Sequence, residues 1–567
     1  MINSEVSRIL YEMAEMLDIQ GVEWKPRAYK KAAQVIESLS KDLTDIYKEG
    51  GIKALIALPG IGEGIAKKIV QFIETGRIKD FEKLKKEIPV DIKGLMLVEG
   101  LGPKTIKRLY MELNVKNLGD LEKAAKSGKI SRLEGFKKKT EENILEAIKF
   151  ARQSGKRKTL GYALPIAEEI LNYLKKFKSI NNAELAGSIR RKKETIGDID
   201  ILVTSSKPNE TMDYFTDMKG ITRVISKGQT KSTVIYKGME VDVRVLKPDQ
   251  FGSALNYFTG NKNHNIALRK IAIKRGFKLS EYGLFRGKEK ICGKTEKEIY
   301  EKLGMQYIEP ELRRNAGEIE AALQKKLPKL VNLSDIRGDL QSHSNWSDGA
   351  DTILEMAEAA KKLGHEYLAV TDHVGMIKVA GAMDAKKISR YSKTIDKTNE
   401  MLEKFTLLKG AEVDIKPDGS LAATKKTLEK LDLIIAAVHS GFKKDNTSRI
   451  IKAIENPYVD IIAHPTGRII NKRQGYPLNM SKVIEAAKKN SKILEINAHP
   501  SRLDLNDMYA RDAIEERVKL SIGTDAHSAD QLDFYKFGVY TARRAWATKK
   551  DIVNTFSLNK LKKLISR

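Results

Sequence analysis

The stretch from residue 187 to residue 203 reads GSIRRKKETIGDIDILV, and the interpretation of the whole chain starts from it. A Gly-Ser pair and a basic cluster lead into a short apolar run that carries Asp198 and Asp200 at positions i and i+2. Because a β-strand points alternate side chains to one face, we expect both carboxylates to project together. A later alternating run, Val241-Asp242-Val243, offers a third carboxylate from a neighbouring strand. Such a set fits Mg²⁺, which prefers one or two carboxylates together with phosphate oxygens.

Donors for a triphosphate stand directly before these aspartates. They are the backbone N–H groups of Gly187 and Ser188 and the guanidinium groups of Arg190 and Arg191, which match the geometry and charge of phosphate. The alternative for an isolated pair of aspartates is a solvated strand edge, because most acidic residues are exposed. The combination of these phosphate donors, which we call the phosphate cradle, with the three carboxylates favours two-metal nucleotidyl transfer instead.

Length and charge indicate a multidomain protein with a polyanionic partner. The 567 residues exceed the roughly 250–300 residues at which single cores stop growing. The 103 Lys and Arg residues outnumber the 75 Asp and Glu residues, which leaves a net charge of +28. Nucleic acid is the first candidate partner, and a surface charged for solubility or heat stability is the alternative.

Compartment and membrane association can also be judged from composition. Cys292 is the single cysteine, so an internal disulfide is excluded and a reducing cytoplasm fits. The N-terminus lacks the layout of a signal peptide, and the longest apolar runs, such as residues 433–438, fall far short of the about 20 residues of a membrane span. We expect a soluble cytoplasmic protein with no membrane contact.

The stretch at 187–203, together with FGSALNYFTGNKNHN at 251–265, resembles the bacterial and archaeal family X DNA polymerases. The resemblance covers nearly the whole chain and implies a DNA-directed DNA polymerase that fills short gaps in DNA repair. Mg²⁺, dNTPs and gapped or primed duplex DNA are the implied cofactor and partners, with Asp198, Asp200 and Asp242 as catalytic metal ligands. The implied nucleotide site consists of Gly187, Ser188, Arg191, Tyr257, Phe258, Gly260, Asn265 and Arg269.

The resemblance also implies a role for each part of that site. Tyr257 and Phe258 would lie at the deoxyribose, while Asn265 and Arg269 would contact the incoming base and the template. Most of the family has a further basic residue at the start of the helix that we expect from Pro165. Here Ile166 stands in its place, so no such contact is expected.

Residues 1 to about 150 show helical periodicity interrupted by three similar glycine turns. These are LPGIG at 58–62, VEGLG at 98–102 and LEGFK at 133–137. A glycine turn that opens a helix lets the backbone approach a phosphate closely. We therefore expect helix-hairpin-helix elements that hold DNA without reading its sequence, rather than ordinary glycine-capped hairpins. The candidate phosphate contacts are Gly60, Gly62, Gly64, Gly100 and Gly102. In the third copy, Lys137 replaces the second glycine, so this copy is less suited to bind phosphate.

Family X enzymes that carry a 5′-deoxyribose-phosphate lyase form a Schiff base with a lysine that matches Lys68. The DNA end is then held by positions that match Lys25 and Tyr29. A lysine amine attacks an aldehyde only when it is unprotonated, which requires a lowered pKa. The alternative is that Lys67 and Lys68 only contact phosphate, so lyase activity is a secondary expectation.

In the second half, short apolar strands alternate with helical stretches, and polar residues follow the strands directly. Such units close into a parallel barrel whose active site lies at the carboxyl ends of the strands. A single histidine at a strand end is usually structural, but five of the eight histidines occupy such positions together with three carboxylates. This mixed nitrogen and oxygen set suits Zn²⁺, Mn²⁺ or Fe better than Mg²⁺ alone.

This half resembles the polymerase and histidinol phosphatase (PHP) domain, whose trinuclear metal site hydrolyses phosphoesters. The resemblance implies 3′→5′ exonuclease or 3′-phosphatase activity with up to three Mn²⁺ or Zn²⁺ ions. The implied ligands are His343, Asp348, His373, Glu412, His439, His464, Asp525 and His527. The opening motif of the family reads D-x-H-x-H, but here Gln341 stands at its first histidine. An amide oxygen binds zinc less well than imidazole does, so one metal site is expected to be weakened. His365 and His499 lie outside the motifs and are expected to be structural or to face substrate.

The expected fold is therefore multidomain, with an all-α helix-hairpin-helix region, an α+β nucleotidyltransferase palm and thumb, and a distorted TIM-like α/β barrel. The expected boundaries are 1–85 for a helical 5′-end-binding domain, 86–155 for further hairpins, 156–250 for the palm, 251–315 for the thumb, 316–334 for a linker and 335–567 for the barrel. Two alternatives stay open: a DNA-binding scaffold with a degenerate barrel, and a histidinol-phosphatase-like phosphoesterase fused to a nucleic-acid module. A monomer is expected.

Overall fold

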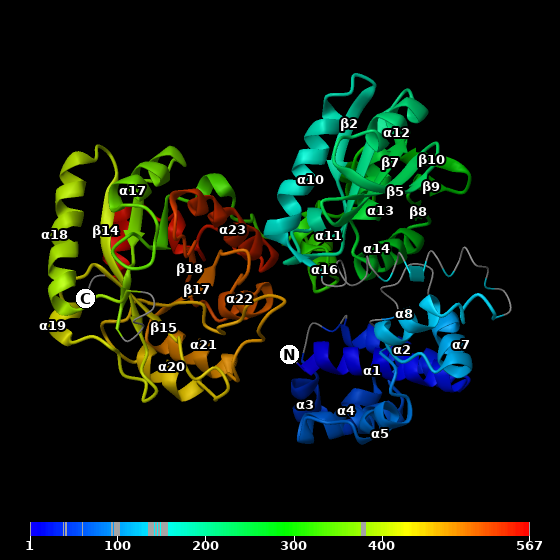
Figure 1. Ribbon diagram of the computed structural model, residues 1–567, viewed down its shortest axis with the longest axis horizontal. Helices are drawn as coiled ribbons and strands as arrows, with labels where there is room; N and C mark the ends of the chain where they lie inside the picture. Colours follow the sequence, from blue (N-terminus) through cyan, green and yellow to red (C-terminus); the bar gives the residue numbers. More distant parts are fainter. Residues whose placement is uncertain are drawn as a thin grey trace. The chain divides into compact units, whose positions relative to one another are not determined.

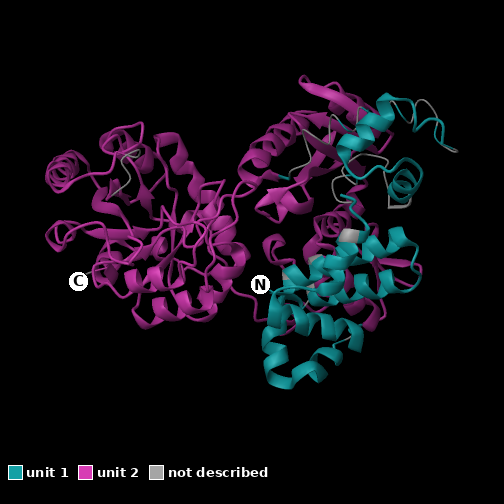
Figure 2. Ribbon diagram, turned by 60° about the horizontal axis from the view of Figure 1, so that its bottom comes forward, with its two compact units in different colours: residues 1–157, 315–319 teal, residues 158–314, 320–567 magenta. Residues whose placement is uncertain are grey.

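The computed structural model describes residues 2–565, apart from residues 38, 40–41, 59, 92–94, 96–102, 134–135, 137–140, 142–143, 146–147, 149–156 and 376–380. The chain forms two compact units, shown in different colours in Figure 2. The first unit comprises residues 1–157 and 315–319, and the second comprises residues 158–314 and 320–567.

The first unit is built from amphipathic helices. Their apolar stripes, repeated every three to four residues, bury Leu10, Met13, Ile36 and Ile69 in one core. The helices are α1 (Ile2–Gln20), α2 (Lys25–Glu37), α3 (Leu43–Ile56), α4 (Glu63–Thr75), α5 (Lys79–Glu87), α7 (Pro103–Leu113) and α8 (Leu118–Lys126). The first glycine turn joins α3 to α4, as expected for a helical hairpin. The turn at 98–102 and most of the turn at 133–137 lie outside the described residues.

The second unit begins with a five-stranded sheet of order β2-β4-β7-β6-β5. Its strands are β2 (Ile180–Leu185), β4 (Asp198–Ser205), β5 (Ile221–Lys227), β6 (Lys231–Tyr236) and β7 (Met239–Leu246). The β4 and β7 strands are parallel, and the other neighbours are antiparallel. The alternating pattern of β7 buries Val241 and Val243 and turns Asp242 to the opposite face.

Short elements flank this sheet at both ends of the segment. Before it lie β1 (Lys158–Thr159) and α10 (Leu160–Lys175); within it lie α11 (Gly187–Arg190), β3 (Thr195–Ile196) and α12 (Pro208–Thr216). After it follow α13 (Phe251–Thr259), α14 (Lys262–Lys274), the three-stranded sheet of β8 (Lys278–Ser280), β9 (Gly283–Arg286) and β10 (Glu289–Cys292), and α15 (Glu296–Lys302). The Gly-Ser turn expected at Gly187 is thus the start of the short helix α11.

One helix begins earlier than the sequence predicts. We expect it from Pro165, but α10 starts at Leu160 and contains Pro165 in its second turn. Leu160, Ala163 and Leu164 are buried, and their packing outweighs the one helical hydrogen bond that a proline removes.

The remaining residues form a parallel barrel. Its strands are β11 (Gly338–Ser342), β12 (Tyr367–Val370), β14 (Thr406–Asp414), β15 (Leu433–Ala437), β16 (Ile461–Ile462), β17 (Ile493–Asn497) and β18 (Leu520–Gly523), in that spatial order. The short strand β13 (His373–Val374) pairs with β14. A bridge from Ser342 to Ala526 and a 2.7 Å hydrogen bond from the His343 N–H to the Ala526 carbonyl link the two edges beyond the strand ends.

Helices surround these strands, as Figure 1 shows for the barrel. They are α17 (Ile353–Lys362), α18 (Ala385–Met401), α19 (Lys425–Leu428), α20 (Thr447–Ile454), α21 (Met480–Lys489), α22 (Asp507–Glu515) and α23 (Tyr535–Arg544). Alternate residues of β15 face different sides: Leu433 and Ile435 pack with Phe556 and α24 (Leu558–Ile565), while Ile434 packs towards the surrounding helices. Before the barrel, the expected helical linker at 316–334 contains the short helix α16 (Glu318–Leu323), and a 3-10 turn begins at its end (Leu333–Asp335).

Candidate active sites

The paired strands β4 and β7 carry the three predicted carboxylates. Asp200 lies directly beside Asp242 in the parallel register, and Asp198 is two residues before Asp200 on the same face of β4. Asp242 accepts a hydrogen bond from Thr233 Oγ1 at 2.5 Å and forms a 2.8 Å ion pair with Lys231, both on β6. The structure therefore brings together the two strands that the sequence motifs predicted.

The environment of Asp200 is unfavourable for a negative charge. Burial, followed by the negative charges of Asp198 and Asp242, raises the pKa of Asp200 to about 7. A divalent cation relieves this repulsion, so the donor set fits a hard ion. Gly187, at φ +60, faces this carboxylate, and any side chain there would collide with Asp200.

The phosphate cradle forms only in part as predicted. Ser188 Oγ is buried and has no hydrogen-bond partner among the described residues, as expected for a group that contacts a ligand. Arg191 instead donates to the carbonyl of Thr259 and lies beside Gly260. Arg190 is not free for a triphosphate, because its guanidinium forms a 2.6 Å ion pair with Glu296 and a 2.7 Å hydrogen bond with Thr259.

That ion pair is structural. Burial raises the pKa of Glu296, but Arg313 and Arg190 outweigh it and hold the pKa at about 2. Arg313 is fully buried and would be strongly destabilising without its partner carboxylate. Arg190 therefore joins α11 to α15 through Glu296. This differs from the sequence-based prediction, in which the Arg190 guanidinium binds phosphate.

The predicted sugar and base contacts lie together. Tyr257, Asn265 and Arg269 line one small pocket, and Asn265 Nδ2 donates to the Tyr257 carbonyl at 2.7 Å. The Arg244 guanidinium lies 4.6 Å from the centroid of the Phe258 ring and 3.8 Å from Asp242. Arg244 thereby connects Phe258 to Asp242.

In the first unit, the first glycine turn presents an uncapped helix end. Gly62 is the N-cap of α4 and gives no side-chain capping bond. Side chains added at Gly62 or Gly64 would meet nothing within 4 Å, while Gly60 adopts φ +85. The free N–H groups of the first turn of α4 are thus open to an anion. Gly100 and Gly102 lie outside the described residues.

Lys68 does not have the lowered pKa that a Schiff-base lysine requires. Its ammonium forms a 2.5 Å ion pair with Asp80. Burial alone would lower the pKa of Lys68, but Asp80 and Tyr29 outweigh burial and raise it. Lys25, at the start of α2, is exposed.

At the carboxyl ends of the barrel strands, the predicted ligands form three groups. Their ligand atoms lie within 4.8 Å of one another: His343, Asp348, His373 and His527; His373, Glu412 and His439; and His343, Glu412 and Asp525. His464 joins the second group through Glu412, at 3.0 Å from its Oε1. Mixed imidazole and carboxylate groups of this kind fit Mn²⁺ or Zn²⁺.

The charges in this centre are strongly coupled. Burial lowers the pKa of His439, but Glu412 and Asp414 raise it to about 10. Burial likewise lowers the pKa of His527, and Asp348 with Asp525 raises it to about 9. Because a metal ligand must be a neutral imidazole, metal binding has to displace protons here.

Gln341 is buried beside the third group but is engaged elsewhere. Its side-chain amide contacts the carboxyl group of Glu495, whose pKa burial raises well above its usual range. The third group therefore has one ligand fewer than the D-x-H-x-H motif supplies.

The structure adds residues that the sequence motifs did not include. Asp414 Oδ1 lies 2.7 Å from His439 Nδ1, and Arg502 Nε lies 3.4 Å from Asp525 Oδ2. Asp414 follows Glu412 by two residues on one strand, and this spacing could have identified it. His365 packs against Tyr535, and His499 packs against Phe534, so both contribute to packing.

Taken together, the sheet and the barrel define a nucleotidyltransferase joined to a metal-dependent phosphoesterase. Family models match the same segments: a DNA polymerase beta palm at residues 164–274, a DNA polymerase beta thumb at 254–314 and a PHP domain at 339–499. A helix-hairpin-helix domain matches residues 1–78, and a helix-hairpin-helix tandem matches 52–116 and 92–149.

Two similar proteins support this assignment, one over the full length of the chain and one over part of it. A DNA polymerase/3′-5′ exonuclease PolX of Bacillus subtilis (strain 168) is 38% identical over 572 aligned residues, covering 99% of both chains. A probable phosphatase of Thermoanaerobacter sp. (strain X514) is 34% identical over 231 residues, covering 38% of this chain and 89% of the phosphatase. This chain belongs to the family X DNA polymerases that carry a C-terminal PHP domain. Within its described residues, no helix has the length and apolar character needed to cross a bilayer.

Proposed function

We infer that the chain is a DNA-directed DNA polymerase that fills short gaps, and that its PHP domain removes nucleotides from 3′ ends. The observation that carries the polymerase assignment is the parallel pairing of Asp200 with Asp242 beside Gly187. Asp198, Asp200 and Asp242 would hold Mg²⁺, while Ser188 and the N–H groups of α11 would hold the triphosphate. Divalent cations bound at the two sites would neutralise phosphate charge and lower the pKa of the attacking hydroxyl or water.

The two activities can be tested on one preparation. With Mg²⁺ and dNTPs, a duplex with a one-nucleotide gap should be extended by one template-directed nucleotide. With Mn²⁺, a 5′-labelled single strand should shorten stepwise from its 3′ end. Gap extension without shortening would support a degenerate barrel, and shortening without extension would support a phosphoesterase fused to a nucleic-acid module.

We propose that the group of His343, Glu412 and Asp525 holds its ion more weakly than the other two, because Gln341 is bound to Glu495. Replacing Gln341 with histidine should add an imidazole ligand and tighten Mn²⁺ binding there by about 10-fold or more. Isothermal titration and metal analysis of the full chain would give the affinity and the number of ions. Gln341→Asn is the matched control, and an unchanged affinity and ion count in Gln341→His would contradict the proposal.

We propose that Lys68 contacts the DNA 5′ phosphate and is a poor Schiff-base nucleophile while Asp80 holds it. Borohydride trapping on DNA with a 5′-deoxyribose phosphate should then give little adduct with the wild type. Asp80→Asn should increase the adduct several-fold because it removes the charge that raises the pKa of Lys68, and Lys68→Ala should abolish it. Lys67→Ala is the control, since Lys67 pairs with Glu63 instead. Efficient trapping by the wild type would contradict the proposal.

We also propose a cytoplasmic monomer with gapped or primed DNA and dNTPs as partners. The unpaired Cys292 fits a reducing compartment. The charge of +28 supports nucleic acid as the partner.

A further inference from the structure

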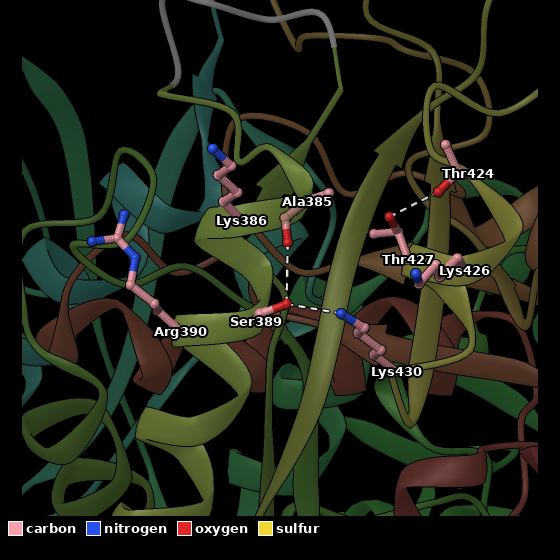
Figure 3. Close-up of a pocket in the computed structure, with 8 residues that line it drawn as sticks. All are labelled: Ala385, Lys386, Ser389, Arg390, Thr424, Lys426, Thr427 and Lys430. Carbon is pink, nitrogen blue, oxygen red and sulfur yellow. Dashed lines mark hydrogen bonds between the residues drawn. The ribbon is translucent and has the colours of Figure 1, made fainter.

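A basic groove lies between α18 and the segment that contains α19, outside the three metal-ligand groups. Its volume is about 590 Å³. Lys386 and Arg390 line one wall and Lys426 and Lys430 line the other, as Figure 3 shows. Ser389, Thr424 and Thr427 add hydroxyl groups to the lining, and no acidic or aromatic side chain is among the lining residues.

Most of these cations lack a partner within the part of the chain that the structure describes. Lys386, Arg390 and Lys426 form no ion pair there, although nearby Lys409 lies 2.7 Å from Asp396. Lys430 Nζ donates to Ser389 Oγ at 2.8 Å, which links the two walls (Figure 3). Like charges gathered in one groove raise the local concentration of anions.

One wall of the groove starts beside a metal ligand. The N–H of Met383 donates to the His373 carbonyl at 2.7 Å. Ala385, the first residue of α18, follows two residues later. Two residues span at most about 7 Å, so this wall lies at the rim of the metal-ligand groups.

The other wall starts beside a second metal ligand. A side chain at Gly375 would contact both Asp414 and Ala422, and Asp414 holds His439 at 2.7 Å. Thr424, which lines the groove, follows Ala422 by two residues. Both walls thus lead from the rim of the metal-ligand groups outwards.

We propose that this groove binds the sugar-phosphate backbone of a single DNA strand whose 3′ end lies at the metal-ligand groups. The inference rests on the proposed 3′→5′ exonuclease function and assigns a site for the nucleotides upstream of the one removed. A strand presents a row of phosphates, which matches several cations spread over both walls. Because no aromatic side chain lines the groove, the contacts are to the backbone and independent of sequence.

The test compares the wild type with the triple variant Lys386→Gln, Arg390→Gln and Lys426→Gln in the full chain. The substrates are oligothymidylate of ten nucleotides and the p-nitrophenyl ester of thymidine 5′-monophosphate, both with Mn²⁺. The variant should lose about 10-fold in kcat/KM on the oligonucleotide, mainly through KM. Its slope of log KM against log salt should fall by about 2, since three phosphate contacts to a single strand contribute about 0.7 each. Hydrolysis of the small ester should stay within twofold.

A matched control removes the same charge elsewhere. Lys361, Lys362 and Lys489 are exposed and lie at the ends of α17 and α21, away from the strand ends that carry the ligands. Their triple glutamine variant should keep the wild-type salt slope. An unchanged slope in the groove variant, or an equal loss on the small ester, would overturn the proposal.

A second measurement does not depend on hydrolysis. In His439→Ala, oligothymidylate should protect Lys386 and Lys426 from acetylation by an N-hydroxysuccinimide ester at least threefold, as read by peptide mass spectrometry, and leave Lys361 unprotected. Absence of protection would refute the groove as a DNA site. If the wild type hydrolyses neither substrate, the exonuclease assignment fails, and protection still decides whether the groove binds DNA.

Discussion

Replacing Asp200 with asparagine is expected to lower the rate of gap filling more than about 100-fold. Mutating a residue that only hydrogen-bonds to a metal ligand already costs about 10–100-fold in activity, and Asp200 is expected to be a ligand itself. The substitution preserves shape and removes the charge that lies beside Asp242 in the strand register. Primer extension on a one-nucleotide gap in Mg²⁺ measures the loss. Shortening of a 3′ end in Mn²⁺ should be unchanged, since the barrel ligands are not altered.

The same substitution should stabilise the metal-free protein in a pH-dependent way. The pKa of Asp200 is about 7 in the fold against a usual value of 3.8, so the folded state binds a proton more tightly than the unfolded state. Stability therefore falls as pH rises from about 4 to 7 and stays low above that range. At about 1.4 kcal/mol per pKa unit, asparagine should stabilise the fold by up to about 4 kcal/mol at pH 8.

Thermal unfolding in EDTA at pH 8 and pH 4.5 measures this effect. The Tm of the unit that contains Asp200 should rise by several degrees at pH 8, with little change at pH 4.5. Asp217→Asn is a control, because Asp217 lies at the end of α12 and away from the three carboxylates. Equal shifts at both pH values, or gap filling at the wild-type rate, would contradict the assignment of Asp200.

Local patterns in the sequence predicted much of the architecture. The two-residue period places Asp198 and Asp200 on one face, and the strand-end rule places His373, His439 and His464 at one end of the barrel. These rules are local, since they depend only on the geometry of a strand and on the position where it ends. They therefore need no knowledge of which strands become neighbours.

The features that the sequence did not predict all depend on contacts between distant residues. Arg190 pairs with Glu296, 106 residues away, so its charge alone suggested a phosphate ligand. The protonation of Lys68 is determined by Asp80, on the next helix. Gln341 could be recognised as a departure from the motif, but its partner Glu495 lies on another strand of the barrel. The charge and spacing of a side chain are compatible with several hydrogen-bond or ion-pair partners, and only the tertiary packing determines which of them it contacts.

Replacing Glu412 with glutamine is expected to remove the exonuclease activity, by more than about 100-fold, while gap filling stays at the wild-type rate. Glu412 belongs to two of the three metal-ligand groups of the barrel, as His343 and His373 also do. Its Oε1 lies 3.2 Å from His439 and 3.0 Å from His464, and its Oε2 lies 3.4 Å from His343 and from His373. Degradation of a 5′-labelled single strand in Mn²⁺ measures the loss. Asp414→Asn, which changes a residue that contacts His439, should cost less, about 10–100-fold.

Stability gives an independent check on the same residue. The pKa of His439 is raised to about 10, so its pairing with Glu412 stabilises the fold fully below about pH 6.5, and this contribution disappears as pH rises through 10. Breaking a buried pair of this kind costs about 3–5 kcal/mol. In EDTA, Glu412→Gln should therefore lower the Tm of the barrel most near pH 6 and least near pH 10. A variant that keeps exonuclease activity, or that loses the same stability at both pH values, would contradict this role of Glu412. A carboxylate that contacts four imidazoles cannot be neutralised without changing the charge of those imidazoles.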